Sequence, residues 1–294
     1  MNHSFSTVRD LLRYAVTRFN QAELVFGQGN SNAYDEAVYL VLHTLHLPID
    51  TLDPFFEARL LKDEISAIFD IIEQRITQRL PAAYLTHEAW LHGYHFYVDN
   101  RVIVPRSFIG ELLIKRLFPS IAAPDKLTTV LELCTGSGCL AIMAAHAFPY
   151  AKIDAVDLSM QALQVAQQNI DNYDLNERIM LFEGDLFKPL PSRQYDLIIA
   201  NPPYVNDESM RVLPAEYRHE PRVALAGGSD GMNIVRRIVS AAHNWLTDNG
   251  MIIIEIGNEK HQLKTVLGNL PLTWLPTNAS NDSVFLLHAA DLPY

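Results

Sequence analysis

From Thr128 onward the chain alternates apolar runs of strand length with segments of helical spacing. The apolar runs are TVLELC, KIDAVDL, IMLFEGDL, YDLIIANPP and MIIIEI, and the helical segments include CLAIMAAHAF, MQALQVAQQNI and GMNIVRRIVSAAHNWL. A strand that is apolar along its whole length is buried on both faces, as in a parallel sheet covered by helices on each side. The alternation therefore predicts an α/β fold, and the final LTWLPTNASNDSVFLLHA predicts an antiparallel pair of strands at the sheet edge.

Three helical segments precede this alternation. The first follows Thr7, where Asp10 stands at the position that completes a capping box. The second is expected to begin after Ser31 or Asn32, and the third to run from about Lys62 to Leu80, just before Pro81. In each segment the apolar residues recur at helical spacing. Residues 1–85 are therefore predicted to form a small helical bundle.

Between these two parts, residues 89–104 are rich in aromatic and β-branched residues around a glycine and an Asp-Asn pair, which predicts a β-hairpin. We expect the bundle to span residues 1–85, a hairpin linker residues 86–106, and the α/β domain residues 107–294. A length of 294 residues agrees with two domains.

The composition narrows the class of protein and its partners. The formal charge is 23 − 34 = −11, which disfavours a nucleic-acid partner and favours a basic one. The first residues lack the pattern of a secretion signal, and the apolar runs are too short to span a membrane. The two cysteines, Cys134 and Cys139, fit neither a disulfide framework nor metal-ligand spacing. We expect a soluble, cytoplasmic protein with no bound metal and no membrane partner.

A glycine loop follows the first apolar strand, in the stretch VLELCTGSGCLA. Gly136 and Gly138 allow a tight turn before the next helix, whose N-terminus presents free N–H groups. In an open α/β sheet this loop lies at the carboxyl ends of the strands, where ligands bind. With Asp157 at the end of the next strand, the loop is compatible with a dinucleotide such as NAD.

Two further acids favour a different ligand. Glu132 stands near the glycine loop, where it could hold an amino-acid ammonium, and Asp185 follows the third strand, where it could accept a hydrogen bond from an adenine amino group. Several carboxylates suit a cationic adenosyl amino acid better than a pyrophosphate, which needs none. Asp157 and Asp185 could equally serve as helix caps or loop residues, so both interpretations stay open at this point.

The fourth apolar strand stops at Asn201, Pro202, Pro203 and Tyr204. The prolines end the strand pairing and hold the main chain rigid. The Asn201 side chain and a fixed backbone carbonyl can accept both protons of a planar amino or amide group, and the Tyr204 ring can lie against it. Orientation is the main catalytic contribution of such a site, so no strong base is required. The stretch predicts methylation of an sp² nitrogen.

The sequence resembles the protein-glutamine methyltransferases of the class I Rossmann-like type. The resemblance rests on LELCTGSGCLAI, AVDLS, GDLF, NPPYV and EPRVALAGGSDGMNIVRRIV, and covers nearly the whole chain. Within that family, DEAVYLVLHTLHLP and VPRS followed by IGELL are similar to the branch that acts on the third protein of the large (50S) ribosomal subunit. Phe108 stands where that branch is expected to have proline.

The resemblance implies S-adenosylmethionine as the cofactor, a basic ribosomal protein as the partner with no direct need for nucleic acid, and substrate docking by residues 1–85. An alternative role for the bundle is mainly to cover the core. The implied cofactor-binding residues are Glu132, Thr135, Gly136, Ser137, Gly138, Asp157, Asp185, Leu186 and Asn201. Asn201, Pro202, Pro203 and Tyr204 would hold the glutamine, with Asn201, Pro202 and Tyr204 as the catalytic set. Arg106 and Glu220 would orient or wall the site.

Three other functions remain as alternatives to methylation of a ribosomal-protein glutamine. The same chemistry on a peptide chain release factor is the nearest one. Adenine methylation of nucleic acid would need a basic groove and a target-recognition region, which the charge and the short helical part disfavour. A non-enzymatic assembly factor would have no use for an intact glycine loop, three acids and the asparagine.

Overall fold

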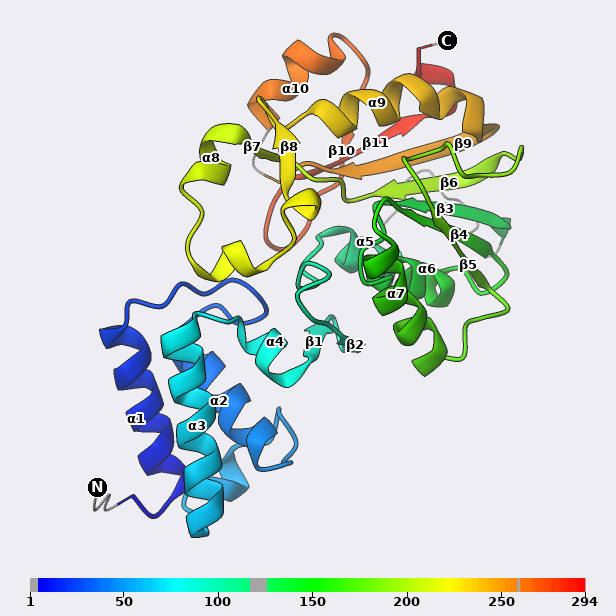
Figure 1. Cartoon of the computed structure of the whole chain (residues 1–294). Helices are drawn as coiled ribbons and strands as arrows, with labels where there is room; N and C mark the ends of the chain where they lie inside the picture. Colours follow the sequence, from blue (N-terminus) through cyan, green and yellow to red (C-terminus); the bar gives the residue numbers. More distant parts are fainter. Residues whose placement is uncertain (1–4, 117–125, 258–259, 294) are drawn as a thin grey trace. The chain divides into compact units, whose positions relative to one another are not determined.

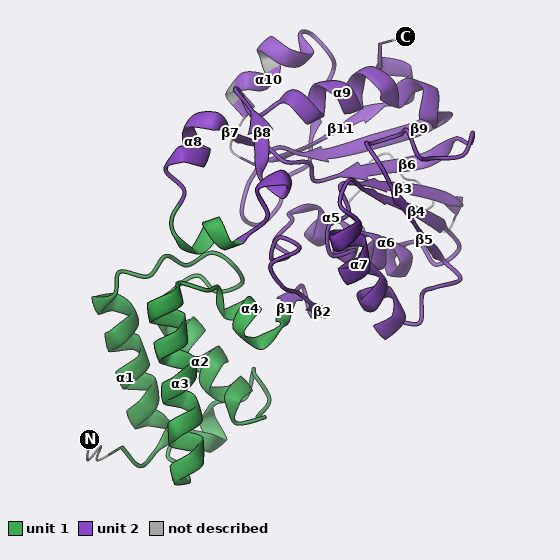
Figure 2. Cartoon of the chain, viewed as in Figure 1, with its two compact units in different colours: residues 1–89, 214–219 green, residues 90–213, 220–294 purple. Residues whose placement is uncertain are grey.

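The computed structural model describes residues 5–116, 126–257 and 260–293. Two compact units make up the chain, one of residues 1–89 and 214–219, the other of residues 90–213 and 220–294 (Figure 2). Among the described residues no helix has both the length and the apolar character needed to cross a membrane.

The first unit is a helical bundle of α1 (Val8–Gln21), α2 (Ala33–Thr44), α3 (Lys62–Gln78) and α4 (Ala82–Thr86). The predicted capping box is present, since the Thr7 hydroxyl accepts from the Asp10 N–H at 3.2 Å and the Asp10 carboxylate accepts from the Thr7 N–H at 3.1 Å. Helix α3 ends before the predicted Leu80, because Arg79 adopts a left-handed conformation with φ of 58°. The apolar faces of the helices form one buried cluster.

A buried ion-pair network fastens residues 214–219 to this bundle. The Glu216 carboxylate accepts from Arg79 Nη1 at 2.9 Å and from the Val25 N–H at 3.1 Å. Arg75, which is 1% exposed, pairs with Glu36 at 2.7 Å and lies 3.7 Å from Glu216. The segment therefore belongs to the first unit by its contacts, although it lies far along the sequence from the helices.

The second unit is built on a seven-stranded sheet with the order β10-β11-β9-β6-β3-β4-β5 (Figure 1). Five strands run parallel, and β11 and β10 complete the sheet in antiparallel pairing at one edge, as predicted. Their bounds are β3 (Thr129–Leu133), β4 (Lys152–Asp157), β5 (Ile179–Glu183), β6 (Tyr195–Ala200), β9 (Leu246–Glu255), β10 (Thr273–Trp274) and β11 (Val284–His288).

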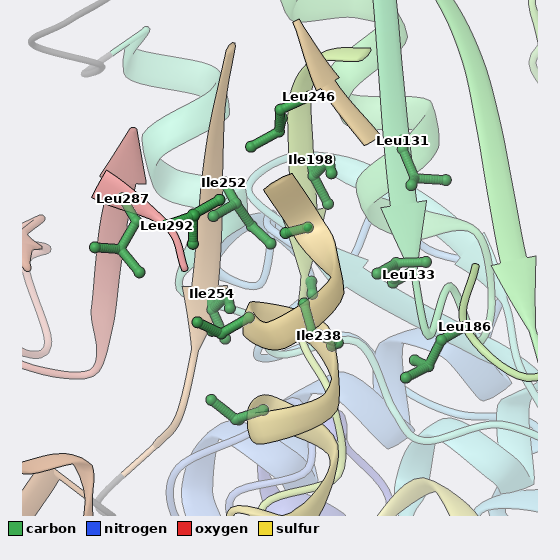
Figure 3. Packing of buried hydrophobic residues seen from close by; sticks show 14 of the residues in the cluster. Leu131, Leu133, Leu186, Ile198, Ile238, Leu246, Ile252, Ile254, Leu287 and Leu292 are labelled. Carbon is green, nitrogen blue, oxygen red and sulfur yellow. The ribbon is translucent and has the colours of Figure 1, made fainter. Parts of the chain in front are cut away.

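Helices cover both faces of this sheet. Figure 1 shows α9 (Asn233–Ala242) and α10 (Lys260–Leu267) on one face, and α5 (Ile109–Lys115), α6 (Cys139–Ala147) and α7 (Met160–Asn172) on the other. The α9 side chains Val235 and Ile238 pack on strand residues such as Leu131, Ile198 and Ile252, all buried in one cluster (Figure 3). Burial on both faces explains why β3, β4, β6 and β9 are largely apolar. The edge strand β5 departs from this expectation, because only Ile179 of it is buried and Met180 is exposed.

The predicted hairpin is shorter than its sequence pattern. β1 (Glu88–Leu91) and β2 (Tyr94–Tyr97) form a two-stranded sheet, and the residues that follow are not in a strand. The Val104 N–H donates instead to the Glu220 carboxylate at 3.0 Å. A second small sheet was not anticipated: β7 (Val205–Asn206) pairs in parallel with β8 (Ala226–Gly228), and α8 (Asp207–Arg211) follows β7.

Candidate active site

A pocket of about 460 Å³ lies at the carboxyl ends of the parallel strands, within the second unit. The ends of four of these strands and the loops after them contribute Gly136, Asp157, Asp185 and Asn201 to its wall. Further parts of the wall come from α9, from Ala162 of α7 and from segments 101–103 and 221–226. Its volume falls within the usual range for a small-molecule site.

The glycine loop turns the chain sharply from β3 into α6. Gly138, with φ of 77°, is the N-cap of α6, and its N–H donates to the Thr135 carbonyl at 2.9 Å. A Cβ atom at Gly138 would lie only 3.1 Å from the Cβ atom of Ala166, so both the conformation and the close packing require glycine. A hydrogen bond stiffens this loop, because the Thr135 hydroxyl donates to the buried Glu132 carboxylate. Burial raises the pKa of Glu132 to about 8.

Asp157, the last residue of β4, is held in a fixed orientation. Its Oδ2 accepts from the Gly136 N–H at 2.8 Å and its Oδ1 from the Ser159 N–H at 2.9 Å. Burial raises the pKa of Asp157 above the ordinary 3.8. Asp157 also lines the pocket, and a carboxylate has about four lone-pair sites, so the group can accept further hydrogen bonds from neighbouring hydroxyls.

Asp185 follows β5 and is clamped by two cations. Arg237 Nη2 donates to both carboxylate oxygens, at 2.6 and 2.7 Å, and Lys188 Nζ to one of them at 2.8 Å. The hydrogen bonds from Lys188 and Arg237 lower the pKa of Asp185. Both Asp185 and Arg237 line the pocket, and buried Leu186 beside them adds an apolar surface. The clamp keeps Asp185 ionised and fixed.

The Asn-Pro-Pro-Tyr stretch leaves β6 at the same edge. Asn201 and Pro203 line the pocket, whereas Pro202 is buried and Tyr204 packs against the hydrophobic cluster under α9. The Val205 N–H donates to the Leu225 carbonyl at 2.9 Å, which begins the β7–β8 pairing. The stretch is thus held between the main sheet and the small one.

Arg106 and Glu220 connect two segments of the pocket wall without lining the pocket. Arg106 Nη1 and Nη2 donate to the two Glu220 oxygens at 2.5 and 2.8 Å, and Arg106 Nη1 also donates to the Val104 carbonyl at 3.0 Å. The neighbours Ile103 and Pro221 both line the pocket. The ion pair therefore fixes the position of one wall segment against the other.

Of the residues selected from the sequence, six meet at the pocket: Gly136, Asp157, Asp185, Leu186, Asn201 and Pro203. The other six lie outside its lining: Glu132 in β3, and Thr135, Ser137, Gly138, Pro202 and Tyr204 in the same loops. Arg237 was missed. The run VRRIV marks a helix with two arginines, but nothing in it indicates which arginine faces the loop after β5.

The two cysteines near the glycine loop are not suited to thiolate chemistry. Desolvation raises the pKa of both cysteine thiols, that of Cys139 to about 12, so neither forms a thiolate readily. Within the described ranges, no three histidine, cysteine or acidic side chains come together as a metal would require.

Comparison with known proteins identifies relatives along the whole chain. The model of the methyltransferase small domain matches residues 110–216. The chain is 63% identical to the ribosomal protein uL3 glutamine methyltransferase of Burkholderia pseudomallei (strain K96243) over 296 residues, 98% of this chain and 96% of that one. The enzymes of the same name from Bordetella pertussis (strain Tohama I) and Neisseria gonorrhoeae (strain ATCC 700825) are 55% and 52% identical, each match covering 96% of this chain and 94% of the relative.

Proposed function

The chain belongs to the family of ribosomal protein uL3 glutamine methyltransferases, and we propose that it transfers a methyl group from S-adenosylmethionine to the side-chain amide nitrogen of a glutamine in uL3, a protein of the large (50S) ribosomal subunit. The observation that carries the proposal is that Asn201, Asp157 and Gly136 line one pocket. An acceptor for amide protons thus lies in the same cavity as a glycine loop and an oriented carboxylate.

The pocket fits the chemistry of the cofactor. Asp157, oriented by two N–H donors, suits the paired ribose hydroxyls. Asp185, ionised and fixed by Arg237, suits the adenine amino group, and Leu186 an adenine face. The loop of Thr135, Gly136, Ser137 and Gly138 would surround the methionine portion, while buried Glu132 stiffens that loop through Thr135. When bound, the cofactor supplies an electrophilic methyl group on a sulfonium ion.

Asn201 and a carbonyl of the Pro-Pro segment would hold the substrate amide. Each would accept one of its two protons, which fixes the plane of the amide and leaves the nitrogen lone pair perpendicular to that plane, directed at the methyl group. Tyr204 would lie against the flat group. Because the amide is positioned rather than deprotonated before attack, attack itself needs no strong base. As the N–C bond forms, the C–S bond of the sulfonium would break to leave a neutral thioether, and one amide proton would then pass to water.

The remaining parts of the chain receive roles under the same proposal. Residues 1–85 dock the protein substrate, residues 86–106 form the linker, and residues 107–294 carry out catalysis. The net charge of −11 favours a basic ribosomal protein as the partner. We place the reaction in the cytoplasm, where ribosomal proteins are made, and propose that it needs no direct contact with nucleic acid.

The test uses the purified chain with methyl-labelled S-adenosylmethionine and purified uL3. We expect label in uL3, and mass spectrometry of the peptides should assign one added methyl group to a glutamine side chain. A release factor and ribosomal RNA serve as parallel substrates. Label in the release factor but not in uL3 would move the activity to the other branch of the family. Label in RNA alone would refute amide methylation altogether.

A further inference from the structure

Gly257, the second residue after β9, lies directly under the ring of Tyr204. A Cβ atom placed on Gly257 would come within 2.6 Å of Cε2, 2.9 Å of Cζ and 3.1 Å of Cδ2 of that ring. The first two distances are shorter than any ordinary contact between carbon atoms, so one edge of the ring rests on the glycine backbone. Gly257 also has a left-handed φ of 54°.

The two residues meet because their strands are neighbours. β6 and β9 pair in parallel with Ala200 opposite Ile254, so the segments that follow both strands leave the sheet at the same edge. The Asn-Pro-Pro-Tyr stretch continues from β6, and Ile256 and Gly257 continue from β9. The contact thus forms at the carboxyl edge, beside the pocket.

The backbone on either side of Tyr204 is already fixed. A Cβ atom on Gly227 of β8 would lie 2.8 Å from the Pro203 carbonyl oxygen, so these two main chains are in close contact before the tyrosine. After it, the Val205 N–H donates to the Leu225 carbonyl at 2.9 Å. The ring itself packs against the cluster under α9, and its contact with Gly257 limits the rotation of the side chain about its own bonds.

We propose that Gly257 is a positioning residue of the methyl-transfer site. Because Gly257 has no side chain, the Tyr204 ring can pack against its backbone, and this contact sets the orientation of the ring. This inference rests on the proposed function, in which the ring lies against the substrate amide. A methyl group at position 257 displaces the ring, and a displaced ring no longer meets the plane in which Asn201 holds the amide. Reaction rates at such sites respond strongly to misplacement of about 1 Å.

The test compares Gly257→Ala, Tyr204→Ala and the double variant with the wild-type chain. Gly268→Ala is the matched control, because Gly268 has a similar left-handed φ of 61° but no atom within 4 Å of the place that its Cβ atom would take. It therefore reports the cost of backbone strain alone. Single-turnover methylation of uL3, cofactor affinity by calorimetry and thermal unfolding are measured for all five proteins, and crystal structures give the position of the Tyr204 ring.

We expect Gly257→Ala to lower kcat by about 10- to 100-fold, with the cofactor Kd unchanged within about twofold. In the Tyr204→Ala background the same substitution should change kcat by no more than about twofold, because the ring that it displaces is absent. Gly268→Ala should leave kcat unchanged. The crystal structure of Gly257→Ala should show the Tyr204 ring rotated away from its wild-type position.

Equal losses of kcat in both backgrounds, or an unmoved ring in the Gly257→Ala crystal, would overturn the inference. If Gly257→Ala does not fold, the double variant decides: recovery of folding supports the ring contact, and failure of both while Gly268→Ala folds contradicts it. A wild-type chain that methylates no uL3 glutamine would instead refute the proposed function. In that case the unfolding and crystallographic comparisons would still test whether Gly257 fixes the orientation of the Tyr204 ring.

Discussion

One nitrogen of Arg237 bridges both carboxylate oxygens of Asp185, at 2.6 and 2.7 Å. The two residues come from different elements, since Arg237 lies on α9 and Asp185 in the loop after β5. Arg237 thus ties a helix on one face of the sheet to the part of the pocket assigned to adenine. Lys188 donates to one of the two oxygens, at 2.8 Å, and 76% of its side chain is exposed, against 46% for Arg237.

Replacing Arg237 with alanine is expected to weaken cofactor binding, because Asp185 loses the group that fixes its direction. We expect the Kd for S-adenosylmethionine to rise about tenfold, the equivalent of one charge-assisted hydrogen bond, while kcat at saturating cofactor changes little. Calorimetric titration measures the Kd. Lys188→Ala is the comparison variant and should change the Kd by less than about twofold, because Lys188 donates to one oxygen only and is not among the residues that line the pocket. Equal effects of both variants would contradict the assignment.

Asn201→Ala should abolish turnover and spare cofactor binding. Its side chain lines the pocket, and its acceptor is assigned to the substrate amide. We expect kcat to fall by at least about 100-fold, as for the loss of an oriented polar group in a transition state. Labelled methyl transfer gives kcat, and calorimetry gives the cofactor Kd. The exposed Asn176→Ala serves as the control and should behave as wild type. Turnover retained by Asn201→Ala would remove the residue from the reaction.

Asp157→Asn is expected to raise the cofactor Kd by about tenfold or more, because the amide replaces one acceptor of the ribose hydroxyls with a donor.

The affinity of the wild-type chain for the cofactor should also fall as the pH is lowered. Burial raises the pKa of Asp157, so the ionised acceptor is lost at a higher pH than for an ordinary aspartate. Titrations over a range of pH check both effects, with exposed Asp248→Asn as the control. A Kd unaffected by Asp157→Asn would exclude the ribose contact.

Glu255→Gln should remove a pH dependence of folding stability. Glu255 is buried, accepts from the Ser107 hydroxyl at 2.6 Å and the Phe108 N–H at 2.9 Å, and its pKa rises from 4.5 to about 7, mainly through burial. Between these values the folded chain keeps the proton that the unfolded chain has lost, so this group makes stability fall as pH rises. Above about pH 7 the loss is complete.

The variant should therefore gain stability relative to wild type as the pH rises from about 4.5 to about 7 and keep a constant difference above that. Chemical denaturation at several pH values measures the free energy of unfolding. The exposed Glu177→Gln is the control and should run parallel to wild type. A difference between Glu255→Gln and wild type that does not vary with pH would show that Glu255 is ionised throughout.

Glu216→Ala should destabilise the helical unit strongly. Its side chain is 1% exposed, and its loss leaves Arg75 and Arg79 without this partner. Breaking a buried pair in this way typically costs about 3–5 kcal/mol. The exposed pair of Arg9 and Glu57 offers the control, since Glu57→Ala should cost less than about 1 kcal/mol. Denaturation followed by circular dichroism compares the two, and similar losses would show that burial of the pair contributes nothing.

Much of the architecture followed from local patterns. Strands β3, β4, β6 and β9 were predicted because burial on both faces favours apolar residues along a strand, and the α/β methyltransferase fold was confirmed. The apolar run of β5 also predicted a strand, although β5 lies at the sheet edge and is mostly not buried. The capping box at Thr7 was predicted because it involves atoms only three residues apart. The glycine loop and Asn-Pro-Pro-Tyr were found for the same reason, since each is a continuous stretch whose residue types constrain the backbone.

Contacts between distant segments could not be predicted in this way. The clamp of Asp185 by Arg237 spans 52 residues, the pairing of Arg106 with Glu220 spans 114, and Gly257 supports a ring from a different strand. Local spacing states which side chains share a face of one element, but not which face of another element they meet. That depends on strand order and on how the loops close over the sheet edge. The residue types of the site are therefore set locally, whereas their orientation arises only when the chain is folded.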